Sequence, residues 1–286
     1  MLLFFACLAW GGSYAVGRYG LNSGSAIWLT LWRWGSGALI FLTYLVITWP
    51  TISETIKSNW LKLIVISLLG IVIYPASLFL AVAHTTALNA SLYLATTPVL
   101  ITIASACVWR EKVSGFNIIA IGLGIFGACV LLFRGNFQLF IDFRISTTDF
   151  WAVISAISWA AYCVSLPMKP RGLSEFQFLA TIVVMGCAVL ILAGMLIDNE
   201  KIPLPQNQTI AASMIYFAVF PFVLAFLAWN YATTNVGPAV ASPYNNLVPL
   251  LGGVLGVIFL DEAIEKHHLI GGGIIIASLI MNGVRR

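Results

Sequence analysis

Long apolar stretches alternate with short polar connections along the whole chain. A run of about 20 apolar residues is long enough to cross a hydrocarbon core of about 30 Å as a helix. Runs of that length, bounded by charged residues, Pro or Asn, predict ten transmembrane helices. They cover residues 2–18, 26–49, 60–83, 87–109, 114–133, 150–168, 176–197, 210–233, 238–260 and 268–284.

The composition excludes a soluble domain of any size. Of the 286 residues, 60% are hydrophobic and 8% are charged, and the mean hydropathy is +0.99. A soluble domain is about a quarter charged. We therefore expect an all-α integral membrane protein. Residues 1–16 are expected to be a retained first helix rather than a signal peptide, because they lack a basic segment and an Ala-x-Ala cleavage site.

The basic residues predict how the chain lies in the membrane. With both termini in the cytoplasm, eight Lys and Arg residues fall in cytoplasmic connections and five in external ones, an excess that the positive-inside rule favours. We expect a multi-pass protein of a bacterial inner (plasma) membrane. The net charge is +4, but no basic cluster exceeds two residues, so a nucleic-acid partner is not supported. The expected partners are a small-molecule substrate and membrane lipid, with the chain a monomer or weak homodimer.

The two halves of the chain carry matching landmarks. An offset of 149 residues places Trp10 on Trp159. An offset of 151 residues superposes Pro98 on Pro249, Glu111 on Glu262, and Gly122 on Gly273. Each half therefore has a helix with a central proline, then a carboxylate, then a glycine-rich helix. The alternative is a chance coincidence in a chain that contains 24 Gly and 11 Pro.

A repeat of five helices has consequences for topology. Five is an odd number, so the second half enters the membrane with the opposite orientation. Inverted repeats recur in secondary transporters, whose substrates bind near the midplane between the halves. We expect a first five-helix repeat in residues 1–134, a connecting loop in 135–149 and a second repeat in 150–286, arranged around a central cavity.

Several short motifs suggest a family. They are Leu8-Ala9-Trp10-Gly11-Gly12-Ser13-Tyr14, Trp32-Arg33-Trp34, His84-Thr85-Thr86-Ala87, Thr97-Pro98, Arg110-Glu111-Lys112 and Asp261-Glu262. Over essentially the whole chain, the sequence resembles the EamA-type branch of the drug/metabolite transporter superfamily. The resemblance implies ten helices around a cavity lined by the first, third and fourth helices of each half. It also implies a transporter without a cofactor, from a family that exports amino acids, other metabolites and toxic compounds.

One departure from a related branch concerns energy coupling. The proton-coupled small multidrug transporters carry a carboxylate inside their first helix, and this chain has none there. All ten acidic residues lie in predicted loops or at helix ends. A carboxylate near the midplane is a usual proton carrier. Facilitated efflux or coupling through another group is therefore favoured.

Arg33 lies about a third of the way into the second predicted helix. A charge at membrane depth costs about 2.5–3.5 kcal/mol on insertion scales. Either Arg33 faces the cavity and attracts a substrate carboxylate, or its side chain reaches the nearby interface beside Trp28, Trp32 and Trp34.

Prolines inside predicted helices are candidate hinges. A missing amide hydrogen bond frees a carbonyl and bends the helix. The alternative is a static kink whose carbonyl is satisfied by neighbouring hydroxyls. The four candidates are Pro75, Pro98, Pro221 and Pro249.

The ninth predicted helix contains the strongest signal of a binding site. Asn245 and Asn246 lie at membrane depth, where amides face protein, water or ligand rather than lipid. Hydrogen bonds between helices are the alternative. Aromatic and hydroxyl side chains complete the expected cavity for an apolar or cationic substrate group, with ordinary packing as the alternative for each. The candidates are Trp10, Ser13, Tyr14, Tyr74, Phe79, Tyr93, Thr97, Trp159, Tyr162, Trp229, Tyr244, Asn245 and Asn246.

Other reactive side chains show no catalytic or metal-binding spacing. The five cysteines lie in apolar segments and are expected to be small buried hydrophobes. His84 ends the third helix, as a proton relay or an inert interfacial residue. His267 and His268 are expected to be solvated.

The leading hypothesis is an exporter of small amphipathic metabolites, amino acids foremost, that works by alternating access. An exporter of drugs or toxic cations is the alternative within transport. A membrane-embedded enzyme acting on lipids would need clustered acids, histidines or nucleophiles at an interface, and the sequence shows no such cluster.

Overall fold

A computed structural model describes residues 1–17, 26–84, 87–110, 113–141, 147–197, 212, 215–260 and 263–283. Within these residues all regular secondary structure is helical. The first half contains α1 Leu2–Gly17, α2 Ala26–Ser58, α3 Trp60–Ser67, η1 Leu68–Ile73, α4 Tyr74–His84, α5 Ala87–Ala95, α6 Thr97–Trp109 and α7 Gly115–Leu132. After α8 Phe137–Ile141 and η2 Thr147–Asp149, the second half contains α9 Phe150–Ser165, η3 Leu166–Met168, α10 Glu175–Ile197, η4 Ala218–Leu224, α12 Ala225–Val236, α13 Pro238–Ala241, η5 Ser242–Asn246, α14 Leu247–Leu260 and α15 Lys266–Gly283.

Seven of the ten predicted ranges overlap helical segments that are long and apolar enough to cross a membrane. The other three ranges belong to α1, to α5 with α6, and to α15. The apolar segments Leu2–Ser13 and Thr97–Trp109 are shorter, and α15 begins with Lys266, His267 and His268, which make its first turn polar. The chain is therefore a multi-pass membrane protein.

The second helix is longer than predicted. The sequence predicts that it ends at residue 49, before Pro50, yet α2 continues through Pro50 to Ser58. Pro50 leaves the carbonyl of Val46 without its usual amide donor. The neighbouring hydroxyls bond to other carbonyls: Thr48 Oγ1 donates to that of Tyr44 (2.9 Å) and Thr51 Oγ1 to that of Thr48 (2.7 Å). An interior proline is tolerated in membrane helices, where local adjustments satisfy the freed group.

Two segments depart from α-helical geometry at matching places. Both η1 and η4 are π-helices, and they begin 150 residues apart, at Leu68 and Ala218. π-Helical turns inside longer helices are rare and often mark functional sites. Two further breaks also correspond: Thr96 separates α5 from α6, and the 3-10 segment η5 separates α13 from α14.

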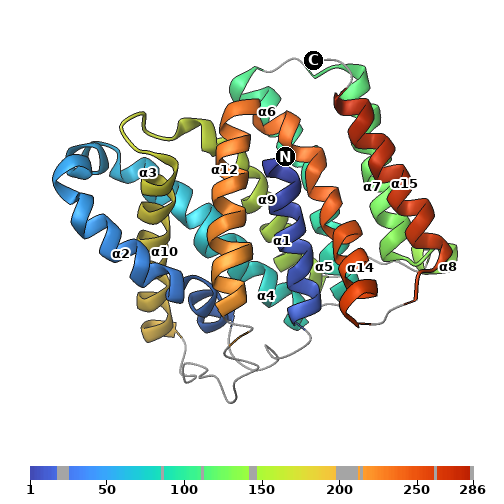
Figure 1. Cartoon of the computed structure of the whole chain (residues 1–286), viewed down its shortest axis with the longest axis horizontal. Helices are drawn as coiled ribbons and strands as arrows, with labels where there is room; N and C mark the ends of the chain where they lie inside the picture. Colours follow the sequence, from blue (N-terminus) through green and yellow to red (C-terminus); the bar gives the residue numbers. More distant parts are fainter. Residues whose placement is uncertain are drawn as a thin grey trace.

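The helices form a bundle with a pair of helices at each of two edges, one helix from each half of the sequence (Figure 1). One edge consists of α7 and α15, and the opposite edge contains α2 and α10. Between them, α1 contacts α12 and α14, while α9 contacts α4 and α6. At the α7–α15 edge the backbones touch, because a Cβ added to Gly127 would lie 2.8 Å from the Gly271 carbonyl oxygen. The N-terminus and the end of α15 lie at the same end of the bundle.

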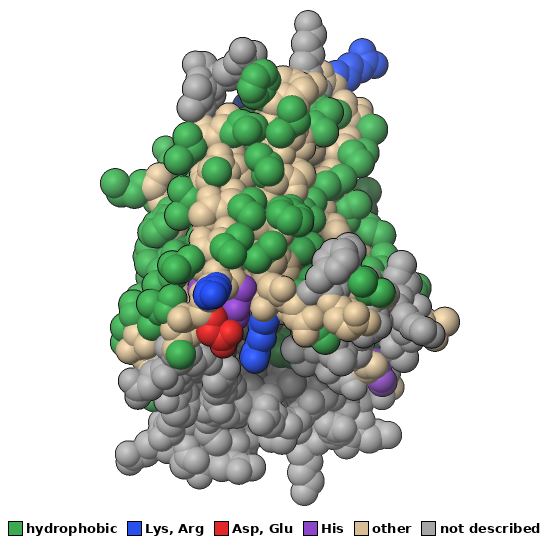
Figure 2. All heavy atoms as spheres, turned by 90° about the vertical axis from the view of Figure 1, so that its right-hand side faces the viewer, with side chains coloured by type: hydrophobic (Ala, Val, Ile, Leu, Met, Phe, Trp, Pro, Cys, Tyr) green, Lys and Arg blue, Asp and Glu red, His purple; other side chains and the backbone are tan. Residues whose placement is uncertain are grey.

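The surface is apolar where it faces lipid. Over the α7–α15 face, hydrophobic side chains are spread over the middle of the described surface, and charged side chains lie toward its two ends (Figure 2). Exposed residues include Leu269 and Ile280 on α15, at 70% and 60%. Serine and threonine side chains such as Ser67, Ser105 and Ser155 are buried between helices. Apolar side chains on the outside and hydroxyl groups between the helices are typical of a protein embedded in a lipid bilayer.

The connection between the halves is partly helical. Residues 135–149 were expected to form a polar loop, but they contain α8 and η2. The end of this connection turns inward, because Asp149 is 1% exposed at the start of α9.

Candidate functional site

Aromatic side chains from four helices meet at the centre of the bundle. This aromatic cluster consists of Trp10 on α1, Tyr74 on α4, Trp159 and Tyr162 on α9, and Phe226 and Trp229 on α12. The ring centroid of Trp159 lies 4.7 Å from that of Tyr74 and 5.5 Å from that of Trp10. It lies 5.8 Å from that of Trp229. Both predicted halves therefore contribute to one cluster, near the middle of their helices.

Most of the aromatic cluster is buried. Tyr162 and Trp229 are fully buried, Trp159 is 4% exposed, and Trp10 and Tyr74 are half-buried. Trp10 packs edge-on against Trp159 and Phe226, with interplanar angles of 84° and 80°, which is a favourable geometry for aromatic rings.

Hydrogen bonds tie the first helix of each half to the π-helix of the other half. Trp10 Nε1 on α1 donates to the carbonyl of Pro221 in η4 (2.8 Å). On α9, Ser158 Oγ donates to the carbonyl of Leu69 in η1 (2.8 Å). Trp10 corresponds to Trp159, so the two donors occupy neighbouring positions of the predicted repeat. Each π-helical segment is thereby anchored at the aromatic cluster.

Polar groups border the aromatic cluster on α12. Tyr162 donates to Asn230 Oδ1 (2.8 Å), and both residues are buried. The Asn230 amide nitrogen and the Thr233 hydroxyl are buried without a hydrogen-bond partner in the described structure. Buried polar groups without partners are unfavourable, and a ligand that hydrogen-bonds to them removes this cost. Asn230 was not among the predicted residues, although an amide next to Trp229 within an apolar run was a visible signal.

The asparagines of the ninth predicted helix lie away from the aromatic cluster. Asn246 is 1% exposed, and its amide nitrogen would lie 2.8 Å from a Cβ added to Gly124 on α7. Ser278 of α15 borders the same glycine. The amide nitrogens of Asn245 and Asn246 have no hydrogen-bond partner in the described structure. Tyr244 is half-buried, and its carbonyl accepts a hydrogen bond from Cys7 Sγ (3.1 Å).

The remaining described candidates are dispersed. Ser13 donates to the carbonyl of Ala9 within α1 (3.3 Å). Thr97 is buried and donates to the Leu94 carbonyl across the α5–α6 break (2.7 Å). Phe79 is half-buried on α4. The side chains of Tyr14 and Arg33 lie outside the described part of the structure, so the two hypotheses for Arg33 stay open.

Tyr93 has an acidic partner that the sequence did not indicate. Its hydroxyl lies 3.2 Å from Asp149 Oδ2 and donates a hydrogen bond to it. The acidic residues were placed in loops or at helix ends, and Asp149 does begin α9, but its side chain is buried. This pair bridges α5 and the second half of the chain. Buried carboxylates in membrane proteins commonly have functional roles.

The four candidate hinges all lie at departures from α-helical geometry. Pro221 lies within η4, and Pro75 follows η1 by two residues. Pro98 and Pro249 lie in the first turns of α6 and α14, directly after the two helix breaks. The prolines thus accompany each irregular segment, as their missing amide hydrogen favours.

Two expectations about reactive side chains were wrong. Cys107 is exposed and Cys129 half-buried, because they lie on outward-facing parts of α6 and α7, whereas the other three cysteines are buried. His267 is only 7% exposed, since its ring packs 4.0 Å from that of His268 at the start of α15. Burial lowers the pKa of His267, with nearby His268 acting in the same direction and Glu265 opposing it. His84 ends α4 as predicted and is exposed. The described residues contain no metal-binding group of His, Cys, Asp or Glu.

Known proteins identify the fold. A crystal structure of a protein with 18% sequence identity superposes with a TM-score of 0.77, over 98% of this chain and 94% of that one. An uncharacterized transporter of Archaeoglobus fulgidus is 24% identical over all of this chain and 97% of its own length. The uncharacterized transporter YyaM of Bacillus subtilis and the uncharacterized inner membrane transporter YedA of Escherichia coli are each 22% identical over 98% of this chain, and over 91% and 88% of their own lengths.

These relatives are transporters, which separates the chain from membrane-embedded enzymes. The EamA-like transporter family matches residues 1–133 and 146–284, which together include nearly every residue of the sequence. The predicted resemblance is confirmed: this chain is a membrane transporter that belongs to the EamA-like transporter family.

Proposed function

We propose that this transporter exports small amphipathic metabolites, amino acids foremost, by alternating access. The observation that carries the proposal is the aromatic cluster, because helices of both halves supply it near the middle of the bundle. Relative motion of the halves would open the cluster to one side of the membrane and then to the other.

The proposal requires two inverted five-helix repeats and therefore ten membrane crossings. Three features support this. The π-helices η1 and η4 begin 150 residues apart. Corresponding helices pair with each other at both edges, α2 with α10 and α7 with α15. The contacts of α1 with α12 and α14 match those of α9 with α4 and α6. Exchanging the halves leaves this set of contacts unchanged.

The chemistry of the cluster favours a substrate with both an apolar and a polar part. Aromatic faces attract apolar groups and cations. The Asn230 amide nitrogen and the Thr233 hydroxyl, which have no partner in the described structure, can form hydrogen bonds with a substrate at the border of the aromatic cluster. A free amino acid presents an ammonium group, a carboxylate and a side chain of varied polarity, and Arg33 is the candidate partner for its carboxylate.

The expected setting is a bacterial inner membrane with both termini in the cytoplasm. The inner-membrane relative YedA and the excess of basic residues on the predicted cytoplasmic side support this setting. We propose a monomer or weak homodimer as the working unit, since the two halves of one chain together supply a complete aromatic cluster.

Flux measurements test the proposal. The purified protein is reconstituted in proteoliposomes, and exchange of labelled amino acids is measured for the wild type, Trp229→Ala and Trp49→Ala. Trp49 is 44% exposed on α2, so its substitution is the matched control. We expect exchange of at least one amino acid, a reduction of ten-fold or more in Trp229→Ala, and little change in the control. Absence of exchange for every amino acid by a correctly inserted protein would contradict the substrate class.

Export of cationic drugs is the second candidate, because aromatic faces stabilise organic cations without any carboxylate. In this case quaternary ammonium dyes rather than amino acids are exchanged, and overexpression confers resistance to them. The same Trp229→Ala and Trp49→Ala pair locates the site for either substrate.

A further inference from the structure

A large basic cavity lies at the end of the bundle where α2 turns into α3. Its volume is about 880 Å³, and the loop between η3 and α10 closes its other side. Four basic residues line it: Lys57, Lys62, Lys169 and Arg171. Glu54 is the acidic residue of the lining. This basic cavity lies at a helix end, apart from the aromatic cluster, and transport as proposed above does not use it.

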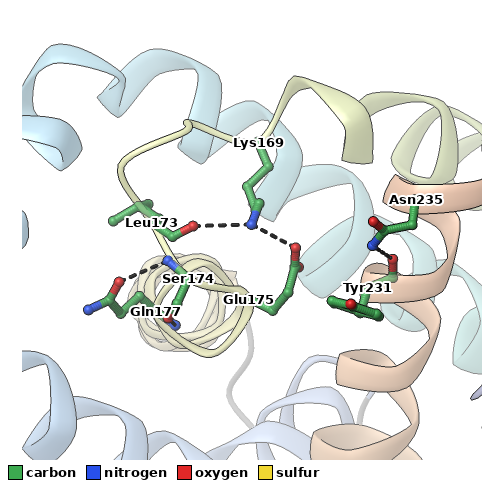
Figure 3. Close-up of polar contacts among 7 residues, drawn as sticks. All are labelled: Lys169, Leu173, Ser174, Glu175, Gln177, Tyr231 and Asn235. Carbon is green, nitrogen blue, oxygen red and sulfur yellow. Dashed lines mark hydrogen bonds and ion pairs between the residues drawn. The ribbon is translucent and has the colours of Figure 1, made fainter.

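The positive charge of the basic cavity is not neutralised by its described neighbours. Lys169 is occupied, since its Nζ lies 2.6 Å from Glu175 Oε1 and donates to the Leu173 carbonyl (3.1 Å; Figure 3). Among the residues that the structure describes, Lys57, Lys62 and Arg171 have no ion pair. With Glu54 counted against these three, the lining keeps an excess of two positive charges.

The loop that carries Arg171 is held in place from both sides. On one side, a Cβ added to Gly172 would lie 2.7 Å from Thr55 Oγ1, so glycine allows the loop to approach α2 closely. On the other side, Ser174 and Gln177 cap the start of α10 reciprocally, with bonds of 2.9 and 3.2 Å (Figure 3). The Lys169–Glu175 pair fixes the loop between these points. The loop that carries Arg171 is therefore held on the side of the basic cavity opposite Lys57 and Lys62.

The surface next to the basic cavity is apolar. Trp60 and Leu61, which begin α3 directly beside the lining residue Asn59, are 59% and 61% exposed. One turn further along the helix, Val65 is 47% exposed. Tryptophan next to basic residues is typical of the boundary between headgroups and hydrocarbon. A ligand in the basic cavity can thus extend an apolar part along α3.

We infer that the basic cavity binds the phosphate-bearing headgroup of an anionic phospholipid, whose acyl chains lie along α3. Phosphate oxygens accept hydrogen bonds from lysine and arginine, and basic pockets between membrane helices suit such headgroups. The apolar surface of Trp60 and Leu61 favours a lipid over a free phosphate compound. This inference requires a membrane protein but is independent of the transported substrate.

Lipid binding to the purified full-length protein tests the inference. Native mass spectrometry and thermal unfolding are measured with added phosphatidylglycerol or phosphatidylcholine. The variant Lys57→Gln/Arg171→Gln is compared with Arg134→Gln/Lys266→Gln, which removes the same charge from a smaller cavity lined by Arg134 and Lys266. Each cation near a membrane surface contributes about 1 kcal/mol, so the first variant is expected to bind phosphatidylglycerol about 30-fold more weakly. The second is expected to bind as the wild type does.

Three outcomes overturn the inference. They are equal losses in the two double variants, equal binding of phosphatidylglycerol and phosphatidylcholine, and stabilisation by glycerol 3-phosphate as large as that by phosphatidylglycerol. The last outcome would assign the cavity to a soluble anion. If the double variant does not fold, Lys62→Gln takes its place, with an expected weakening of about five-fold.

Discussion

The two π-helices occupy matching positions of the predicted repeat, yet the residues around them differ. In η4, Pro221 lies inside the segment and removes an amide donor. In η1, the proline, Pro75, comes two residues after the segment, and the segment itself contains Gly70. A Cβ on Gly70 would overlap the ring of Tyr162. Both π-helices thus have a proline beside or inside them, and in η1 an aromatic ring also approaches the backbone closely.

The π-helical geometry, rather than the position of the proline in it, is common to the two halves. Each π-helix places a carbonyl where the first helix of the other half can donate to it, from Trp10 in one case and Ser158 in the other. The Trp10 indole also packs within the aromatic cluster, whereas the Ser158 side chain is small and contributes little beyond its hydrogen bond. The two anchors are therefore expected to differ in strength, and substitutions can measure the difference.

The largest effect is expected from Gly70→Val. The added side chain would overlap the Tyr162 ring, which is fully buried and has no free volume to move into. Overpacking costs about 1–3 kcal/mol or more. We expect a marked drop in thermal unfolding temperature and loss of substrate exchange.

The matched control for Gly70→Val is Gly122→Val on α7. A Cβ on Gly122 meets no heavy atom within 4 Å. This variant is expected to unfold near the wild-type temperature. Equal destabilisation of the two variants would mean that η1 and Tyr162 do not pack as described.

A medium effect is expected from Trp10→Phe. This substitution keeps an aromatic ring but removes the donor to the Pro221 carbonyl. A hydrogen bond between membrane helices is worth about 0.6 kcal/mol on average, with about 1.7 at most. Because the rings of Trp159, Phe226 and Trp229 also lose contacts with the indole, we expect about 1–2 kcal/mol from unfolding measurements. Trp49→Phe, at an exposed position, serves for comparison, and an equal loss there would argue against the anchor.

The smallest effect is expected from Ser158→Ala, which removes only the donor to the Leu69 carbonyl. The expected loss of stability is about 0.5–1 kcal/mol. Ser158→Thr keeps a hydroxyl and should retain part of the stability. If Ser158→Ala destabilised the protein more than Trp10→Phe, the ranking of the two anchors would be reversed.

The sequence predicted the helices well and their irregularities poorly. Apolar run length located the seven long apolar helical segments because burial in lipid depends mainly on summed hydrophobicity. The prolines Pro75, Pro98 and Pro249 marked places near which the helices become irregular. The π-helical geometry itself had no signal, since Leu68–Ile73 is an ordinary apolar sequence and Gly70 contacts Tyr162, about 90 residues away. Similarly, α2 continues through Pro50 although this proline removes one amide donor.

For the candidate site, the residue types in the sequence indicated the aromatic cluster, but the sequence did not indicate which polar side chains are buried or what they contact. The matched pair Trp10 and Trp159 led directly to the aromatic cluster. Asn230 was missed because one amide hardly changes the hydrophobicity of a 20-residue run. The burial of Asp149 was missed because it depends on a contact with Tyr93 of α5. The burial of His267 was missed because it depends on packing against His268 at the start of α15. Both residues lie in predicted loops, and the sequence alone does not reveal these contacts.

The close pairing of α7 and α15 has a consequence for the surrounding bilayer. Each helix contains 18 residues, which corresponds to a length of about 27 Å. An average hydrocarbon core is about 30 Å thick. We expect lipids along this edge to be compressed by a few ångströms, and such hydrophobic mismatch favours membranes with shorter acyl chains. The length of these two paired helices thus bears on which lipid thickness the transporter fits best.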